Sequence, residues 1–176
     1  MEVSYSLSAD DFLDFQMYSS GKSDEGRRRR NVHRWIMVAI AAGFGLLQLK
    51  SGSLPGAITF FCFTVLCFFF HSKYSAWRYR RHYRRSIAEN YQGRIGIEST
   101  MRLQEDGAVS ITDEGEGLLK YAAVKEMVEL DATYLLILGS DVTLLFPKRQ
   151  VSDEFVRELA QRAEVEIRDE CGMKWA

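Results

Sequence analysis

Residues 35–49 read WIMVAIAAGFGLLQL, and residues 54–70 read LPGAITFFCFTVLCFFF. These two apolar runs are the strongest indication of the architecture, because a helix that crosses a bilayer needs about 17–25 mostly apolar residues. The second run reaches that length, and the first does so if Lys50 extends its side chain to the headgroups. A buried helix of a soluble core is the alternative for the first run, but the short spacing between the runs argues against it. The sequence predicts a two-helix transmembrane hairpin over residues 35–72.

The charges beside the hairpin predict its orientation. The connecting turn, KSGSLPG, contains helix breakers, so the helices should be antiparallel neighbours. Basic residues are retained on the cytoplasmic side of a membrane. The turn has one base, whereas arginines flank both runs on the other side: Arg27, Arg28, Arg29, Arg30, Arg34, Arg78, Arg80, Arg81, Arg84 and Arg85. Both chain ends are therefore predicted to be cytoplasmic, and these arginines set the topology or contact lipid.

Small residues in the first run indicate close helix packing. Ala39 and Gly43 form one pair at a spacing of four, and Ala41 and Gly45 form another. Small residues let helix backbones approach closely in lipid. Packing within the hairpin is the favoured interpretation, and self-association into a homo-oligomer is the alternative. Neither run has a charged residue in its middle, which argues against a proton or ion pathway.

Charge is unevenly distributed along the chain. Residues 1–26 carry six acids and one base, residues 27–94 carry thirteen bases and one acid, and residues 95–176 carry seventeen acids and nine bases. Such asymmetry indicates that the middle part contacts a membrane or a polyanion. Residues 73–92 are predicted to form a basic amphipathic helix, with one face at four-residue spacing: Tyr79, Tyr83, Ile87 and Tyr91. Its arginines act as topology signals alone or also bind anionic lipid; nucleic acid as a partner is disfavoured.

Residues 95–168 change to short strands with turn signals, typical of an antiparallel β domain. Strands are predicted at 96–104, 108–113, 118–122, 126–130, 134–138 and 142–146. Turns are expected at 105–107, 114–117, 131–133 and 139–141. Ser152 is a predicted N-cap for a terminal helix, with an apolar face of Phe155, Val156, Leu159, Ala160 and Ala163. That helix would cap the strands.

Residues 1–20 predict a strand and a helix that belong to the same domain. Val3, Tyr5 and Leu7 alternate, and Ser8 and Asp11 have the spacing of a capping box. We expect both elements to pack on residues 95–168, so that the hairpin interrupts one cytoplasmic domain. Two further segments lie outside these parts, a basic linker at 21–34 and a tail at 169–176.

Three segments carry a resemblance to a known family: SYSLSADDFLDF, MRLQEDGAVSITDEGEGLLKYAAVKEMVEL and TLLFPKRQVSDEFVREL. The chain resembles the YcxB-like family of bacterial membrane proteins, and its C-terminal part is similar to bacterial pleckstrin-homology-like domains. The family's aromatic residue before the central strands is Tyr121 here. The resemblance implies an α+β membrane protein of the bacterial inner membrane, with a transmembrane hairpin inserted in a cytoplasmic β domain capped by a helix. It supplies no catalytic residues.

No catalytic or metal-binding pattern is recognisable. Ser-His-Asp, HExxH, CxxC and Walker patterns are absent from the sequence. Cys62 and Cys67 are interpreted as packing residues. Glu114 and Glu116 suit a solvated turn better than a calcium site, and the Lys148-Arg149 pair suits solvent better than an acidic ligand or the membrane. We therefore predict no enzyme activity, no cofactor and no metal.

Two non-enzymatic functions fit this pattern. The first is a membrane-tethered cytoplasmic binding module that meets a protein or anionic lipid. The alternative is an immunity protein that protects the inner membrane against a membrane-active, pore-forming bacterial toxin. A toxin gene beside this one would favour the alternative.

Overall fold

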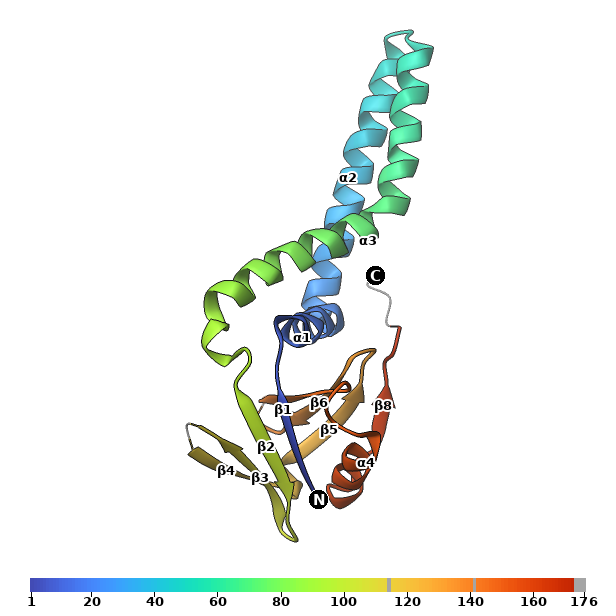
Figure 1. The fold of residues 1–176 in the computed structure, drawn as a ribbon. Helices are drawn as coiled ribbons and strands as arrows, with labels where there is room; N and C mark the ends of the chain where they lie inside the picture. The colour runs from blue at the N-terminus through green and yellow to red at the C-terminus, as the bar shows by residue number, and fades with distance from the viewer. Residues whose placement is uncertain (114, 141, 173–176) are drawn as a thin grey trace. The chain divides into compact units, whose positions relative to one another are not determined.

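The computed structural model describes residues 1–113, 115–140 and 142–172. Glu114 and Asp141 of the predicted turns, and residues 173–176 of the predicted tail, lie outside them. The elements are β1 (Glu2–Ser6), α1 (Ala9–Lys22), α2 (Asp24–Lys50), α3 (Leu54–Asn90), β2 (Glu98–Leu103), β3 (Gly107–Thr112), β4 (Gly115–Lys120), β5 (Val124–Glu129), β6 (Thr133–Leu138), β7 (Thr143–Pro147), α4 (Asp153–Arg162) and β8 (Ile167–Asp169) (Figure 1). The predicted α+β class, with two long apolar helices and antiparallel sheets, is confirmed.

The chain divides into two compact units, with boundaries inside α1 and α3. The β unit comprises Met1–Gln16 and the described part of Tyr83–Lys174, and the hairpin unit comprises Met17–His82. The segment that makes the hairpin unit therefore interrupts the sequence of the β unit.

In the hairpin unit, α2 and α3 are two long helices joined by a short turn (Figure 1). Gly52 lies in that turn with a φ of 79°, which a residue without a Cβ adopts readily. Both helices are long and apolar enough to cross a membrane, by length and composition. Only 11% and 6% of their most apolar windows are buried. A core helix of a soluble protein would have most of this surface covered.

The two small-residue pairs of α2 have different surroundings. Ala41 and Gly45 are buried, and a Cβ at Gly45 would lie 3.3 Å from the Phe61 ring of α3. Ala39 is exposed, and a Cβ at Gly43 would meet no atom within 4 Å. The close approach of α2 to α3 therefore uses Gly45.

The predicted linker over residues 21–34 is wrong for most of its length, because α2 begins at Asp24. Ser23 caps that helix by accepting a hydrogen bond from the Gly26 N–H. Asp24 and Glu25 occupy its positive end, and arginine is a good helix former. The polar composition therefore marked a helix start and not a linker. The predicted helix over 73–92 is the second half of α3, which runs unbroken to Asn90.

The β unit contains two four-stranded sheets, ordered β1-β2-β3-β4 and β7-β6-β5-β8. β1 pairs antiparallel with β2, with Val3 opposite Met101, so the N-terminal strand belongs to the first sheet. β8 was not predicted as a strand. It pairs parallel with β5, with Ile167 opposite Met127, and its last residue, Asp169, falls in the predicted tail.

One core joins both sheets and α4. The Tyr5 ring of β1 lies 5.4 Å from the Phe146 ring of β7, measured between centroids, and burial raises the pKa of Tyr5 to about 12. Ser152 caps α4 as predicted, by accepting a hydrogen bond from the Phe155 N–H. The core includes Met101, Leu103, Ala108, Met127, Leu136, Phe146, Phe155, Val156, Leu159 and Ala160.

The predicted turn at 114–117 is shorter than expected. Glu116 and Gly117 lie in β4, opposite Ile111 and Ser110 of β3, so only two residues separate the paired ends of these strands. Acidic residues and glycine are common in turns, but here the pairing of β3 with β4 outweighs that preference.

Replacing Gly107 with alanine should destabilise the β unit by about 1–3 kcal/mol, the usual cost of overpacking. Gly107 lies opposite Lys120, and a Cβ there would overlap the backbone carbonyl oxygen of Leu119. Gly117→Ala is the matched control, because no atom lies within 4 Å of its Cβ position. Urea unfolding of both variants measures the difference, and equal stabilities would contradict the steric account.

Candidate functional site

The arginines in the last part of α3 lie on the solvent-facing side of an amphipathic helix. Tyr79, Tyr83 and Ile87 are buried or half-buried, at the predicted spacing of four. The exposed arginines of this helix are Arg78, Arg80, Arg81, Arg84 and Arg85. Tyr79, Tyr83 and Ile87 thus share the face that the sequence predicted for residues 73–92, while Tyr74 and Trp77 are exposed.

Two of these arginines make weak surface ion pairs. Arg84 lies 3.9 Å from Asp10, and Arg85 lies 2.9 Å from Glu89. All four side chains are more than half exposed, and such pairs contribute about 0–1 kcal/mol. Arg81 lies 5.8 Å from the centre of the Trp77 ring. Their positive charge therefore remains accessible to an anionic surface.

The arginines that begin α2 have different roles. Arg27 forms an ion pair of 2.7 Å with Asp24, whereas Arg28 and Arg29 are exposed. Arg30 is buried, and its guanidinium donates hydrogen bonds of 3.1 and 3.4 Å to the carbonyls of Ser20 and Gly21.

Those two carbonyls belong to the last turn of α1. A cation stabilises the negative C-terminal end of a helix. Arg30 therefore has a structural role in the hairpin unit. The sequence analysis had grouped it with the arginines that set topology or contact lipid. Residue types and spacing could not predict this role, because the partners are backbone carbonyls at the boundary between the predicted N-terminal helix and the predicted linker.

Arg34 stands where the apolar run of α2 begins. Its guanidinium carbon lies 5.2 Å from the centre of the Phe68 ring on α3 and 6.0 Å from that of Trp35. A guanidinium over aromatic rings is a favourable cation–π arrangement. This arrangement suits a side chain at the boundary between an apolar and a polar layer.

The hairpin unit contains three histidines, His33, His71 and His82. The structure brings two of them together: His33 Nδ1 lies 3.3 Å from His71 Nε2. Both residues are equally distant in sequence from the turn between α2 and α3. Counting residues outward from the turn on both helices could have predicted this pair, whereas spacing along one helix could not.

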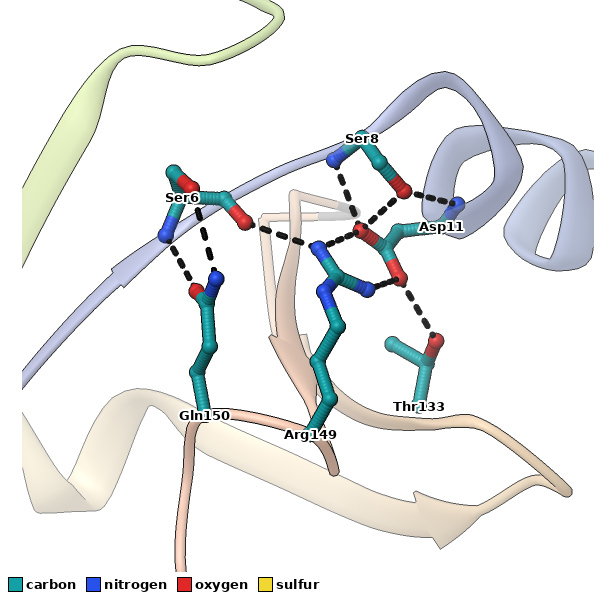
Figure 2. A network of polar contacts seen from close by, with 6 residues as sticks. All are labelled: Ser6, Ser8, Asp11, Thr133, Arg149 and Gln150. Carbon is teal, nitrogen blue, oxygen red and sulfur yellow. Dashed lines mark hydrogen bonds and ion pairs between the residues drawn. The ribbon is translucent and has the colours of Figure 1, made fainter.

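A buried carboxylate in the β unit joins the two ends of the sequence (Figure 2). Asp11 is 2% exposed and accepts two hydrogen bonds from Arg149, of 2.6 and 2.7 Å. It also accepts hydrogen bonds from the Ser8 N–H and hydroxyl, while the Asp11 N–H donates to the Ser8 hydroxyl at 3.4 Å. The predicted capping box is therefore confirmed.

The same contact extends to β1 and β6. Arg149 donates to the Ser6 carbonyl at 3.0 Å, and the Ser6 N–H donates to the Gln150 side chain at 2.6 Å. Thr133 donates to Asp11 at 3.5 Å. Burial alone would raise the pKa of Asp11, but hydrogen bonds from Arg149 and Ser8 outweigh it and hold that pKa below its usual value. The carboxylate is thus ionised at neutral pH.

Lys148 and Arg149 were interpreted as a solvated pair, and both keep some exposure, but each also makes an ion pair within the β unit. Lys148 makes an ion pair of 2.7 Å with Glu129 in the same unit, and its ammonium lies 4.9 Å from the centre of the Tyr134 ring. Arg149 is held by Asp11. Both cations therefore connect elements of the β unit.

Two further predictions concern cysteines and metals. Cys62 is exposed and Cys67 is half-buried, so Cys62 is not the packing residue that its apolar surroundings predicted. Among the residues that the structure describes, no group of three or more His, Cys, Asp or Glu side chains is placed to hold a metal ion.

Comparisons of the chain with protein-family models, curated proteins and solved structures found no match. The resemblance to the YcxB-like family therefore stays a prediction, and the chemistry of the described residues must support any functional proposal.

Replacing Arg149 with methionine should destabilise the β unit by about 2–3 kcal/mol, because it leaves the Asp11 carboxylate buried without its cation. The cost lies below the ~3–5 kcal/mol of a fully buried pair, since 44% of the Arg149 side chain is exposed. Hydrogen exchange of the β1 and β2 amides in the full chain measures the loss.

The control is Arg102→Met, which removes an ion pair of 2.7 Å with Glu2 in the same sheet. Both of those side chains are about half exposed, at 50% and 48%, so the expected cost is at most about 1 kcal/mol. If both variants increase exchange equally, the buried pair does not hold the N-terminal segment in place.

Proposed function

We propose that this protein is a non-enzymatic, membrane-tethered binding module. Its α2 and α3 helices cross the bacterial inner membrane as a hairpin, with both chain ends in the cytoplasm. Its β unit is a YcxB-like, pleckstrin-homology-like domain that meets a partner at the membrane face. The basic half of α3 contacts anionic lipid.

The exposed apolar surface of the hairpin unit carries this proposal. Large apolar side chains cover both helices, and many are more than half exposed: Ile36, Ile40, Phe44, Leu47, Ile58, Phe63, Leu66, Phe69 and Phe70. Soluble monomers rarely expose contiguous apolar patches larger than a few hundred Å². Burial in lipid stabilises such side chains, at roughly 25 cal/mol per Å² of apolar surface removed from water.

The charge pattern supports the orientation. Five arginines precede the apolar run of α2, and five follow that of α3 within its basic half, while the turn between the helices has Lys50 alone. Cytoplasmic loops carry an excess of Lys and Arg. A hairpin oriented by this rule has its turn on the far side and both ends inside.

The architecture of the β unit supports a binding role. Two four-stranded sheets and the apolar face of α4 share one core, an arrangement compatible with a pleckstrin-homology-like domain. A fold of this kind hosts many functions, so the proposal claims binding at the membrane face and leaves the protein partner open. The sequence contains no recognisable catalytic motif, which favours binding over turnover.

A peptide of residues 73–92 should bind vesicles that contain anionic lipid more tightly than neutral vesicles. Replacing Arg80, Arg81, Arg84 and Arg85 with glutamine should weaken binding by about 1 kcal/mol for each lost charge. Added salt should weaken the binding of the unchanged peptide. Co-sedimentation with vesicles measures both effects.

The matched control replaces the same four arginines with lysine, which keeps the charge and should keep the preference. Equal binding of the unchanged peptide to neutral and anionic vesicles would mean that these arginines act only as topology signals.

A further inference from the structure

We infer that the hairpin unit contains a specific binding site for a phosphate-bearing anionic headgroup, in a cavity between α2 and α3. This inference rests on the proposed membrane function and deepens it. It assigns a defined pocket, which includes Arg78 but not the other exposed arginines at the end of α3, to a defined class of ligand.

The cavity has a volume of about 490 Å³, within the roughly 300–1,000 Å³ of small-molecule sites. Its lining is unusually basic: Arg29, Arg30, His33, His71, Tyr74, Ser75, Arg78, Tyr79 and His82. Among these residues there is no carboxylate and no large aliphatic side chain. The lining therefore favours an anion with many acceptor oxygens over an apolar ligand.

Helical spacing explains why these side chains meet. The residues that α3 contributes recur at intervals of three or four from His71 to His82, so they form one helix face. On α2, Arg29 and His33 are one turn apart, with Arg30 beside them. Arg29 and Arg30 of α2 and Arg78 of α3 thus border one space from both helices.

Like charges that face each other repel, and a partly enclosed space strengthens the repulsion. In the β unit, Arg149 has the buried carboxylate of Asp11 as its partner. In this cavity the lining supplies none, so an anion between the helices would remove the repulsion. Arginine can bind a phosphate through two parallel N–H···O bonds. A phosphate oxyanion is therefore a suitable anion for this cavity.

The lining residues have separable roles. The Arg30 guanidinium is already held by the Ser20 and Gly21 carbonyls, so it contributes charge and a fixed wall. Arg29 and Arg78 are exposed side chains on opposite walls, and they are the groups placed to grip a phosphate. In the contact between His33 and His71, one nitrogen donates and the other accepts, which fixes the two rings beside the cavity.

The place of the cavity along the hairpin indicates the source of the phosphate. On α2 the lining ends two residues before the apolar run from Trp35, and on α3 it begins immediately after Phe70. In a spanning hairpin this is the level of lipid headgroups. Basic pockets between transmembrane helices at the cytoplasmic face bind the headgroups of anionic phospholipids. The shared chemistry is a phosphate ester, and a lipid or a soluble phosphate could present it.

The test uses the full-length protein in neutral detergent, titrated with short-chain phosphatidylglycerol, short-chain phosphatidylcholine and inorganic phosphate. Saturable binding of phosphatidylglycerol is expected. Thermal stabilisation or native mass spectrometry measures this binding. The Arg29→Gln/Arg78→Gln variant should weaken it at least about tenfold, since two hydrogen bonds to a charged group are lost.

The matched control is Arg28→Gln/Arg80→Gln. It removes the same charge from neighbouring positions on the same two helices, and neither residue lines the cavity. Its affinity should stay within about twofold of the unchanged protein. If the Arg29→Gln/Arg78→Gln protein melts at a lower temperature without ligand, His33→Gln provides a milder change that should still weaken binding.

The outcomes are distinct. Binding of inorganic phosphate as tight as that of phosphatidylglycerol would assign the site to soluble phosphate esters, with the cavity upheld. Equal weakening by both double variants, or no saturable binding of any anion, would overturn the inference. Failure of the 73–92 peptide to prefer anionic vesicles would count against the proposed surface contact alone, because that peptide lacks the α2 wall of the cavity.

Discussion

The apolar side chains of α2 and α3 must be kept out of water, and this constraint governs the rest of the molecule. Within the hairpin unit the two helices cover little of each other, with Gly45 against the Phe61 ring as a close contact. The remaining surface requires lipid or another apolar partner. In the proposed orientation, the arginines at the base of both helices lie at the level of lipid phosphates.

The hairpin separates the N-terminal segment of the β unit from the rest of that unit in the sequence, and contacts within the β unit bring the two parts together. A long insertion adds little to the entropy cost of closing a loop, because that cost grows only with the logarithm of length. Pairing of β1 with β2 and the Asp11–Arg149 ion pair hold the N-terminal residues against the core formed by the strands and helix that follow α3. The domain is thus continuous in space although its sequence is interrupted.

Sequence patterns predicted the parts of the fold that depend on local chemistry. The apolar runs, the capping box at Ser8 and the N-cap at Ser152 each follow from residue types at fixed spacing. Contacts between residues far apart in the sequence could not be predicted from local patterns. Examples are the pairing of β8 with β5 and the burial of Arg30 against the end of α1. The basic cavity was missed for the same reason, because its two walls meet only in the hairpin register.

Accessibility of the natural cysteines tests membrane insertion most directly. Cys62 is exposed on the surface of α3, and Cys171 is exposed in the β unit. In variants that keep one cysteine each, a membrane-impermeant maleimide should label Cys171 only after cells are broken. Cys62 should stay unlabelled until detergent is added, because lipid alone would cover it. Labelling of Cys62 in intact membranes without detergent would contradict the account.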